Sequence, residues 1–134
     1  MATNIDIVRT GYESFGRGDI QTALSMFAED IEWRGPRWAS DPAACFRGRD
    51  QVLRRIFAPI AQVHDAVALE PHEFYGDGDT VIVTGVFHVG EDAGGEHVDV
   101  PFAHVWTVHS GRIDSLRAYN DVNELVTLRE RGPA

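Results

Sequence analysis

The period of the hydrophobic pattern shifts from mainly helical to mainly strand-like at Pro59, and this change constrains the fold more than any other feature. Before Pro59, apolar residues recur at the spacing of one helix face. The first such stripe consists of Ile5, Val8, Tyr12 and Phe15. After Pro59, apolar and polar residues alternate in stretches that are joined by turn sequences such as GDGD and HSG. Helices followed by hairpin-linked strands predict an α+β fold, in which a curved antiparallel sheet wraps around the N-terminal helices and encloses a cavity.

The chain has 134 residues, the usual size of one domain, so we expect a single domain over residues 1–134. The sequence GRGD separates the first helix from the second, and Asp19 in it is placed to cap the second. A Pro- and Gly-rich connection over residues 35–49 is long enough to contribute to a site. The pattern predicts helices at about 4–15, 19–27 and 50–57, a short strand at 31–35, longer strands at 66–75, 80–89, 98–108 and 112–119, and a last helix from about 121.

Charge and composition disfavour several classes of partner. The net charge is −9 and the isoelectric point is about 5.0, which argues against binding to nucleic acid or to an anionic membrane surface. No window approaches the ~20 apolar residues of a membrane span, and the N-terminus lacks the apolar run of a signal peptide. The single cysteine, Cys45, rules out an intramolecular disulfide and fits a cytoplasmic protein. All 12 basic residues are arginines, which is typical of high-GC bacteria.

We expect neither a metal nor an organic cofactor. None of the six histidines has the spacing of an H-x-H or H-E-x-x-H metal motif. His104 and His109 are five residues apart on one expected strand, which would splay their side chains. No glycine-rich phosphate motif occurs, because GDGDTV lies between two expected strands. Any chemistry of this chain would therefore be cofactor-independent.

Asp121 stands where the last alternating stretch ends and a helical pattern begins, and two interpretations of it stay open. Asp121 and Glu124 have the D-x-x-E spacing of a capping box, in which Asp stabilises a helix by about 1 kcal/mol relative to Ala. Alternatively, an apolar wall supplied by Trp33 and Phe15 raises the pKa of the Asp121 carboxyl, so that it acts as a general acid/base. The two roles are compatible, since a capping side chain can also face a cavity.

Further residues are candidates for contacts with a ligand. Tyr12 lies in the first apolar stripe, and its hydroxyl either bonds within the core or donates to a ligand carbonyl. His104 is either a satisfied residue of the sheet or a group that polarises a carbonyl or orients Asp121. Trp33 lies on a buried strand face, where it packs in the core or forms an aromatic wall for a flat ligand. The remaining candidates for substrate contacts are Phe15, Trp38 and Asn120.

Four motifs occur in an order that resembles the SnoaL-like family. They are Y-x-x-F-x-x-G-D from Tyr12 to Asp19, F-A-E-D-I-E-W from Phe27 to Trp33, F-R-G-R from Phe46 to Arg49, and G-R-I-x-x-x-R-x-Y-x-D from Gly111 to Asp121. The resemblance spans almost the whole chain. SnoaL-like proteins belong to the wider NTF2-like group, together with ketosteroid isomerases and limonene epoxide hydrolases. The resemblance therefore implies a cone-shaped scaffold, which in that group hosts several unrelated activities.

The resemblance also excludes two of the activities known in the group. The catalytic base, the tyrosine and the protonated aspartic acid of ketosteroid isomerases would fall at Gly35, Gly11 and Ala103, and none of these residues carries the required group. Limonene epoxide hydrolases need an Asp-Arg-Asp centre, whereas residues 101–104 read PFAH here. Neither mechanism is expected in this chain.

The acid of the SnoaL-type polyketide cyclases resembles Asp121. Those enzymes use one aspartate, without metal or cofactor, to remove a proton before an intramolecular aldol closure. The pocket positions that accompany this acid resemble Tyr12, Trp33 and His104. Two functions stay open: a cofactor-independent isomerase or cyclase that acts on a small hydrophobic carbonyl compound, or a non-catalytic module that binds a small hydrophobic ligand or serves as a dimerisation scaffold.

The last expected strand suggests how two copies of the chain associate. Arg117 and Tyr119 alternate with Leu116 and Ala118, so the two pairs lie on opposite faces of that strand. Relatives commonly dimerise through the outer face of the sheet. The resemblance therefore implies a homodimer, with Arg117 at or near the interface.

Overall fold

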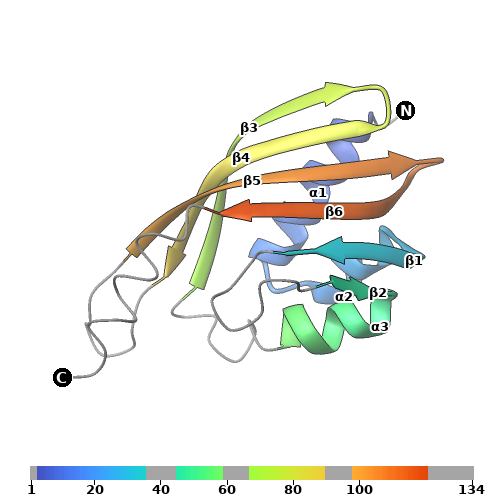
Figure 1. The fold of residues 1–134 in the computed structure, drawn as a ribbon, viewed down its shortest axis with the longest axis horizontal. Helices are drawn as coiled ribbons and strands as arrows, with labels where there is room; N and C mark the ends of the chain where they lie inside the picture. Colours follow the sequence, from blue (N-terminus) through green and yellow to red (C-terminus); the bar gives the residue numbers. More distant parts are fainter. Residues whose placement is uncertain (1–2, 36–44, 59–66, 90–97, 121–134) are drawn as a thin grey trace.

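The computed structural model describes residues 3–35, 45–58, 67–89 and 98–120, and a curved six-stranded sheet is its largest element (Figure 1). The strands lie side by side in the order β2-β1-β6-β5-β4-β3. Their bounds are β1 Phe27–Arg34, β2 Cys45–Arg47, β3 Val67–Asp77, β4 Thr80–Val89, β5 Val98–His109 and β6 Arg112–Asn120. With helices packed on one face of this sheet, the predicted α+β fold is confirmed.

Helix α1 (Asn4–Gly16) begins at a capping box and lies across the sheet, where it contacts β3 and β4 (Figure 1). The Thr3 hydroxyl accepts the backbone N–H of Asp6 at 3.1 Å, and the Asp6 carboxylate accepts the backbone N–H of Thr3 at the same distance. The apolar stripe predicted for this helix faces the core, where Val8 is completely buried. The stripe therefore also brings Tyr12 over the inner face of the sheet.

Two further helices follow the predicted positions. Helix α2 (Ile20–Ser25) is capped by Asp19, whose carboxylate accepts the backbone N–H of Thr22 at 3.2 Å. Helix α3 (Arg49–Val52) continues directly into a π-helical turn, η1 (Leu53–Phe57). Such wider turns displace side chains relative to a regular α-helix and often occur at functional sites. Here the turn carries Ile56 and Phe57, which lie beside the cavity described below.

Two details of the expected pattern are wrong. Phe27 was expected at the end of the second helix, because Ala23, Leu24 and Phe27 also fit a helical stripe, but it begins β1. The chain leaves the helix and joins the sheet at this point, because the carbonyl oxygen of Met26 accepts the backbone N–H of Ile113 in β6 at 2.9 Å. Strand β2 was not expected at all. It has three residues inside the connection 35–49, and so short a segment shows no usable alternation.

The strands are joined mainly as expected, with one exception. Strands β3 to β6 pair antiparallel, and the turns at Gly78 and at Ser110 with Gly111 have the positive φ angles that tight hairpins need. Strand β1, however, pairs parallel to β6, so the sheet is not wholly antiparallel. The expected turn at residues 90–97 and the expected C-terminal helix lie outside the described residues.

Alternation along β5 and β6 separates the two faces of the sheet. Phe102, His104 and Trp106 are buried on the inner face, together with Leu116 and Ala118. Arg117 and Tyr119 point to the outer face and are exposed, as the sequence predicts. Three large hydrophobic residues are exposed within the described ranges, and all lie on the outer face: Tyr75, Ile82 and Tyr119.

Candidate ligand-binding site

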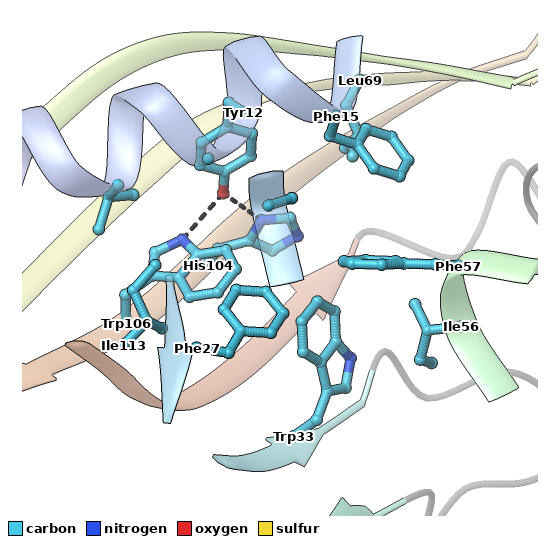
Figure 2. A pocket seen from close by; sticks show the side chains of 13 residues that line it. Tyr12, Phe15, Phe27, Trp33, Ile56, Phe57, Leu69, His104, Trp106 and Ile113 are labelled. Carbon is cyan, nitrogen blue, oxygen red and sulfur yellow. Dashed lines mark hydrogen bonds between the residues drawn. The ribbon is translucent and has the colours of Figure 1, made fainter. Parts of the chain in front are cut away.

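A cavity lies between helix α1 and the inner face of the sheet, and its lining side chains are drawn in Figure 2. It holds about 530 Å³ of space without atoms, any opening to solvent included, and the centre of a water-sized molecule can occupy about 70 Å³ of it. The lining residues are Val8, Gly11, Tyr12, Phe15, Ala23, Phe27, Trp33, Ile56, Phe57, Leu69, His104, Trp106 and Ile113.

Aromatic rings form one wall of the cavity. Trp33 packs edge-on against Phe57, with ring centroids 5.8 Å apart, and against Trp106 at 5.7 Å. Phe27 completes this group, 6.0 Å from both Trp33 and Phe57. Rings packed edge to face hold one another in place and present flat apolar surfaces. The wall therefore suits a flat, mostly apolar molecule.

Three side chains form a chain of hydrogen bonds at one end of the cavity (Figure 2). The indole N–H of Trp106 donates to the hydroxyl oxygen of Tyr12, with 2.9 Å between the two heavy atoms. The Tyr12 hydroxyl lies 2.5 Å from Nδ1 of His104. Tyr12 comes from α1, whereas His104 and Trp106 are two residues apart on the same face of β5. The chain of hydrogen bonds thus ties the helix to the sheet through the site.

Burial keeps His104 neutral. His104 is 8% exposed, and its removal from water lowers the pKa of the imidazole to about 3. Burial also raises the pKa of the Tyr12 hydroxyl above its ordinary value, while the hydrogen bond from Trp106 opposes part of this rise. At neutral pH the site therefore contains an uncharged imidazole and an uncharged phenol.

The proton positions in this chain follow from what each group can do. An indole N–H only donates, so the Tyr12 oxygen must accept from Trp106. The one hydroxyl proton of Tyr12 is then assigned to His104 Nδ1, its other partner within the described residues, because an Nδ1–H directed at the same oxygen would leave that proton without a described acceptor. A neutral imidazole that accepts at Nδ1 carries its proton on Nε2. We therefore assign His104 as a hydrogen-bond donor through Nε2, and Figure 2 shows this nitrogen on the side of the ring away from Tyr12.

Trp33 has a polar atom that the fold does not satisfy. Its side chain is 7% exposed, and its indole nitrogen Nε1 is buried without a hydrogen-bond partner among the described residues. Leaving a buried N–H unpaired costs about 1–3 kcal/mol. In Figure 2 this nitrogen is on the edge of the indole nearer Ile56, which also lines the cavity.

The structure brings together four of the residues singled out from the sequence. Tyr12, Phe15, Trp33 and His104 all line the cavity. Asn120 ends β6 and is not a lining residue, although its side-chain oxygen is buried without a partner among the described residues. Asp121 and Trp38 lie outside the described residues, so their predicted roles stay predictions.

Several lining residues were not identified from the sequence. Trp106 could have been, because it is two residues after His104 on one strand and must share its face. Phe27 was assigned to a helix, and Phe57 was treated as an ordinary helix residue. No signal in a single sequence indicates that the π-helical turn would carry Ile56 and Phe57 to the cavity.

The described residues offer nothing that would hold a metal ion. Within these ranges no three His, Cys, Asp or Glu side chains lie close enough together to coordinate one. His104 is buried, whereas His109 is exposed. No helix in the described part of the chain is both long and apolar enough to cross a membrane.

Comparison with known proteins identifies the family. Residues 8–116 match the sequence model of the SnoaL-like domain. An NTF2-like protein of unknown function from Burkholderia pseudomallei is similar in structure, with a TM-score of 0.77 and 30% identity over 96% of this chain and 98% of that one. The chain therefore belongs to the SnoaL-like family of NTF2-like proteins. No curated protein matches it.

Two further structures are similar over nearly the whole chain. An NTF2-like protein from Burkholderia thailandensis has a TM-score of 0.81 and is 26% identical, over 99% of this chain and 100% of that one. TerC, crystallised with polyporic acid, has a TM-score of 0.77 and is 26% identical, over 95% of each chain.

The variant Tyr12→Phe tests the chain of hydrogen bonds. It leaves the Trp106 N–H and His104 Nδ1 buried without their common partner, so we expect the free energy of unfolding to fall by about 1–3 kcal/mol. Urea unfolding followed by circular dichroism measures this change. The control is Thr10→Val, which removes an exposed hydroxyl bonded to the Asp6 carbonyl oxygen in α1 and should change stability by less than about 0.5 kcal/mol. Equal effects of the two substitutions would contradict the assignment.

Proposed function

We propose that this protein is a cofactor-independent isomerase or cyclase that binds a small, flat, mostly apolar carbonyl compound in the cavity. The observation that carries the proposal is the combination of an aromatic cavity with a buried, neutral His104 at one end. TerC, a similar protein, was crystallised with a small organic compound, polyporic acid, which supports a ligand of this general kind.

The proposed chemistry begins with removal of a proton from the carbon next to the carbonyl group. Negative charge then develops on the carbonyl oxygen, and the Nε2–H of His104 donates a hydrogen bond to it. Such a donor, fixed in a site with little water, stabilises the developing oxyanion strongly. Tyr12 and Trp106 hold the imidazole in the tautomer that can donate.

The proposed base is Asp121. Among the described lining residues no carboxylate is present, so the base must come from elsewhere. Asp121 directly follows Asn120, the last residue of β6, which pairs with Phe102 two residues before His104. The resemblance to SnoaL-type cyclases supports this position for the acid. A carboxylate near an apolar wall has the raised pKa that a general base needs.

The same lack of a carboxylate in the described lining favours a second candidate function. In it the cavity binds a hydrophobic ligand, His104 and the indoles fix the orientation of that ligand, and no proton is removed. Asp121 would then serve only as the cap of a helix. The two candidates predict the same binding and differ in whether the bound carbonyl compound exchanges its acidic protons.

We also propose that the protein forms a homodimer through the outer face of the sheet and acts in the cytoplasm. Tyr75 and Ile82 are paired neighbours on β3 and β4, and both are exposed on this face with Tyr119. Exposed aromatic and aliphatic side chains gathered on one face are typical of interfaces. The free, exposed Cys45 fits a reducing compartment.

Deuterium exchange of 2-tetralone tests the catalytic proposal. This flat ketone has acidic protons next to its carbonyl, and proton NMR in D₂O follows their loss. We expect the protein to accelerate the exchange and Asp121→Asn to reduce this acceleration by about 10²–10⁴-fold, because asparagine caps a helix but is no base. The control is Asp19→Asn, which changes the cap of α2 at a residue that does not line the cavity and should leave the exchange rate unchanged.

Calorimetric binding of 2-tetralone to the same proteins separates the two candidates. Binding without accelerated exchange would establish the non-catalytic module and contradict the enzyme. Accelerated exchange that survives Asp121→Asn would contradict the assignment of the base. Absence of binding would contradict both candidates.

Sedimentation equilibrium tests the dimer. We expect about twice the chain mass of 14.9 kDa for the wild type. Tyr119→Glu places a charge within the proposed interface and should give the monomer mass. The matched control is Gln21→Glu, which adds the same charge at an exposed position on α2. A monomeric wild type would contradict the proposal.

A further inference from the structure

We infer that the ligand of this cavity carries two separate hydrogen-bond acceptors, and that Trp33 binds the second of them through its indole N–H. This inference rests on the proposed function, which assigns one ligand oxygen to His104. It adds a specificity-determining residue and narrows the ligand class to flat compounds with an acceptor oxygen towards each end, such as diketones.

The first step is the unpaired nitrogen of Trp33. Its Nε1 is buried, has no partner among the described residues, and belongs to a side chain that lines the cavity. The side chains on the same side of the indole in Figure 2, Ile56 and Phe57, have no acceptor atoms. Buried donors in folded proteins are nearly always paired, so a partner for this N–H is expected from a bound molecule.

The second step is the kind of polar atom that the described lining offers. Trp33 can only donate, and the tautomer imposed by Tyr12 makes His104 Nε2 a donor as well. The Tyr12 oxygen already accepts from Trp106, and its proton is directed to His104. A ligand thus meets N–H donors and no carboxylate in this part of the cavity, which favours carbonyl or other oxygen acceptors and disfavours amines.

The third step is the separation of the two donors. Trp33 lies on β1 and His104 on β5, and β6 runs between these strands. Strands two places apart in a sheet are roughly 10 Å apart. Trp33 is aligned through Leu116 with Trp106, two residues beyond His104, so the backbone positions that carry the two donors are also offset along the strands. The rings of Trp33 and His104 both pack against Trp106, with centroid distances of 5.7 and 6.0 Å. Acceptors near both ends of one flat molecule match this arrangement better than a single oxygen does.

A matched pair of probes tests the inference by calorimetry. 1,4-Diacetylbenzene has an acetyl oxygen at each end, and 4-isopropylacetophenone has nearly the same shape but only one oxygen. We expect the wild type to bind the two-acceptor probe about fivefold more tightly, the effect of one ordinary hydrogen bond. Trp33→Phe removes the donor together with part of the aromatic wall, so we expect it to weaken the binding of both probes and to abolish the preference between them.

Each result supports or contradicts a defined statement. Equal binding of the two probes by the wild type, or a preference that persists in Trp33→Phe, would overturn the inference but leave the proposed function intact. Failure of both probes to bind the wild type would overturn the proposed function and the inference with it.

NMR of the wild type supplies a measurement that does not depend on Trp33→Phe folding. The chain has three tryptophans, so its indole N–H region contains three signals, and Trp38→Phe and Trp106→Phe assign the remaining one to Trp33. We expect the Trp33 signal to move downfield with 1,4-diacetylbenzene and to move much less with 4-isopropylacetophenone. Equal movement with the two probes would contradict the inference.

Discussion

The hydrogen bonds from Trp106 to Tyr12 and from Tyr12 to His104 connect the architecture of this protein to its chemistry. They cross the core between α1 and β5, so the packing of the helix on the sheet and the state of the imidazole depend on each other. Burying any one of these polar groups without a hydrogen-bond partner would cost free energy of folding. Because each group bonds to the next, the indole N–H, the hydroxyl and Nδ1 all have partners. The direction of donation leaves His104 with its proton on Nε2.

The cavity beside this chain of hydrogen bonds combines apolar walls with donors that have little competition from water. Hydrogen bonds are electrostatically stronger in such surroundings, so a neutral imidazole is sufficient to stabilise the developing oxyanion of the proposed reaction. Trp33 fits the same scheme, since its unpaired N–H adds a second donor, carried by β1, to the one of His104 on β5. The apolar walls and the N–H donors together favour ligands whose main polar groups are oxygen acceptors.

Much of the fold was predictable because it follows from hydrophobic periodicity and turn residues. The stripe through Val8 and Tyr12 indicated the face of α1, and alternation in β5 placed His104 on one side of a strand. The details that failed depend on contacts distant in sequence. Phe27 joined a strand because β6 pairs with the segment before it, and the π-helical turn that carries Phe57 has no signature in a single sequence.

The site was predictable in part for the same reason. Tyr12 and Trp33 could be predicted as site residues because they lie on the apolar face of a helix and of a strand. The hydrogen-bond partner of each hydroxyl or N–H, however, depends on how the helix docks on the sheet. The hydrogen bond from Trp106 to Tyr12 therefore became known only with the structure. The state of His104 was also beyond the sequence, because the pKa of an imidazole depends on burial and on neighbours that periodicity does not identify.

Nitrogen-15 NMR of the His104 ring between pH 8 and pH 5 tests the central claim most directly. The chemical shifts of the two ring nitrogens identify which one carries the proton, and Tyr12→Phe or His104→Gln assigns the signals. We predict a neutral ring over the whole range, with the proton on Nε2 and Nδ1 unprotonated. Titration near the ordinary value of about 6.5, or a proton on Nδ1, would contradict the donor role on which the proposed chemistry depends.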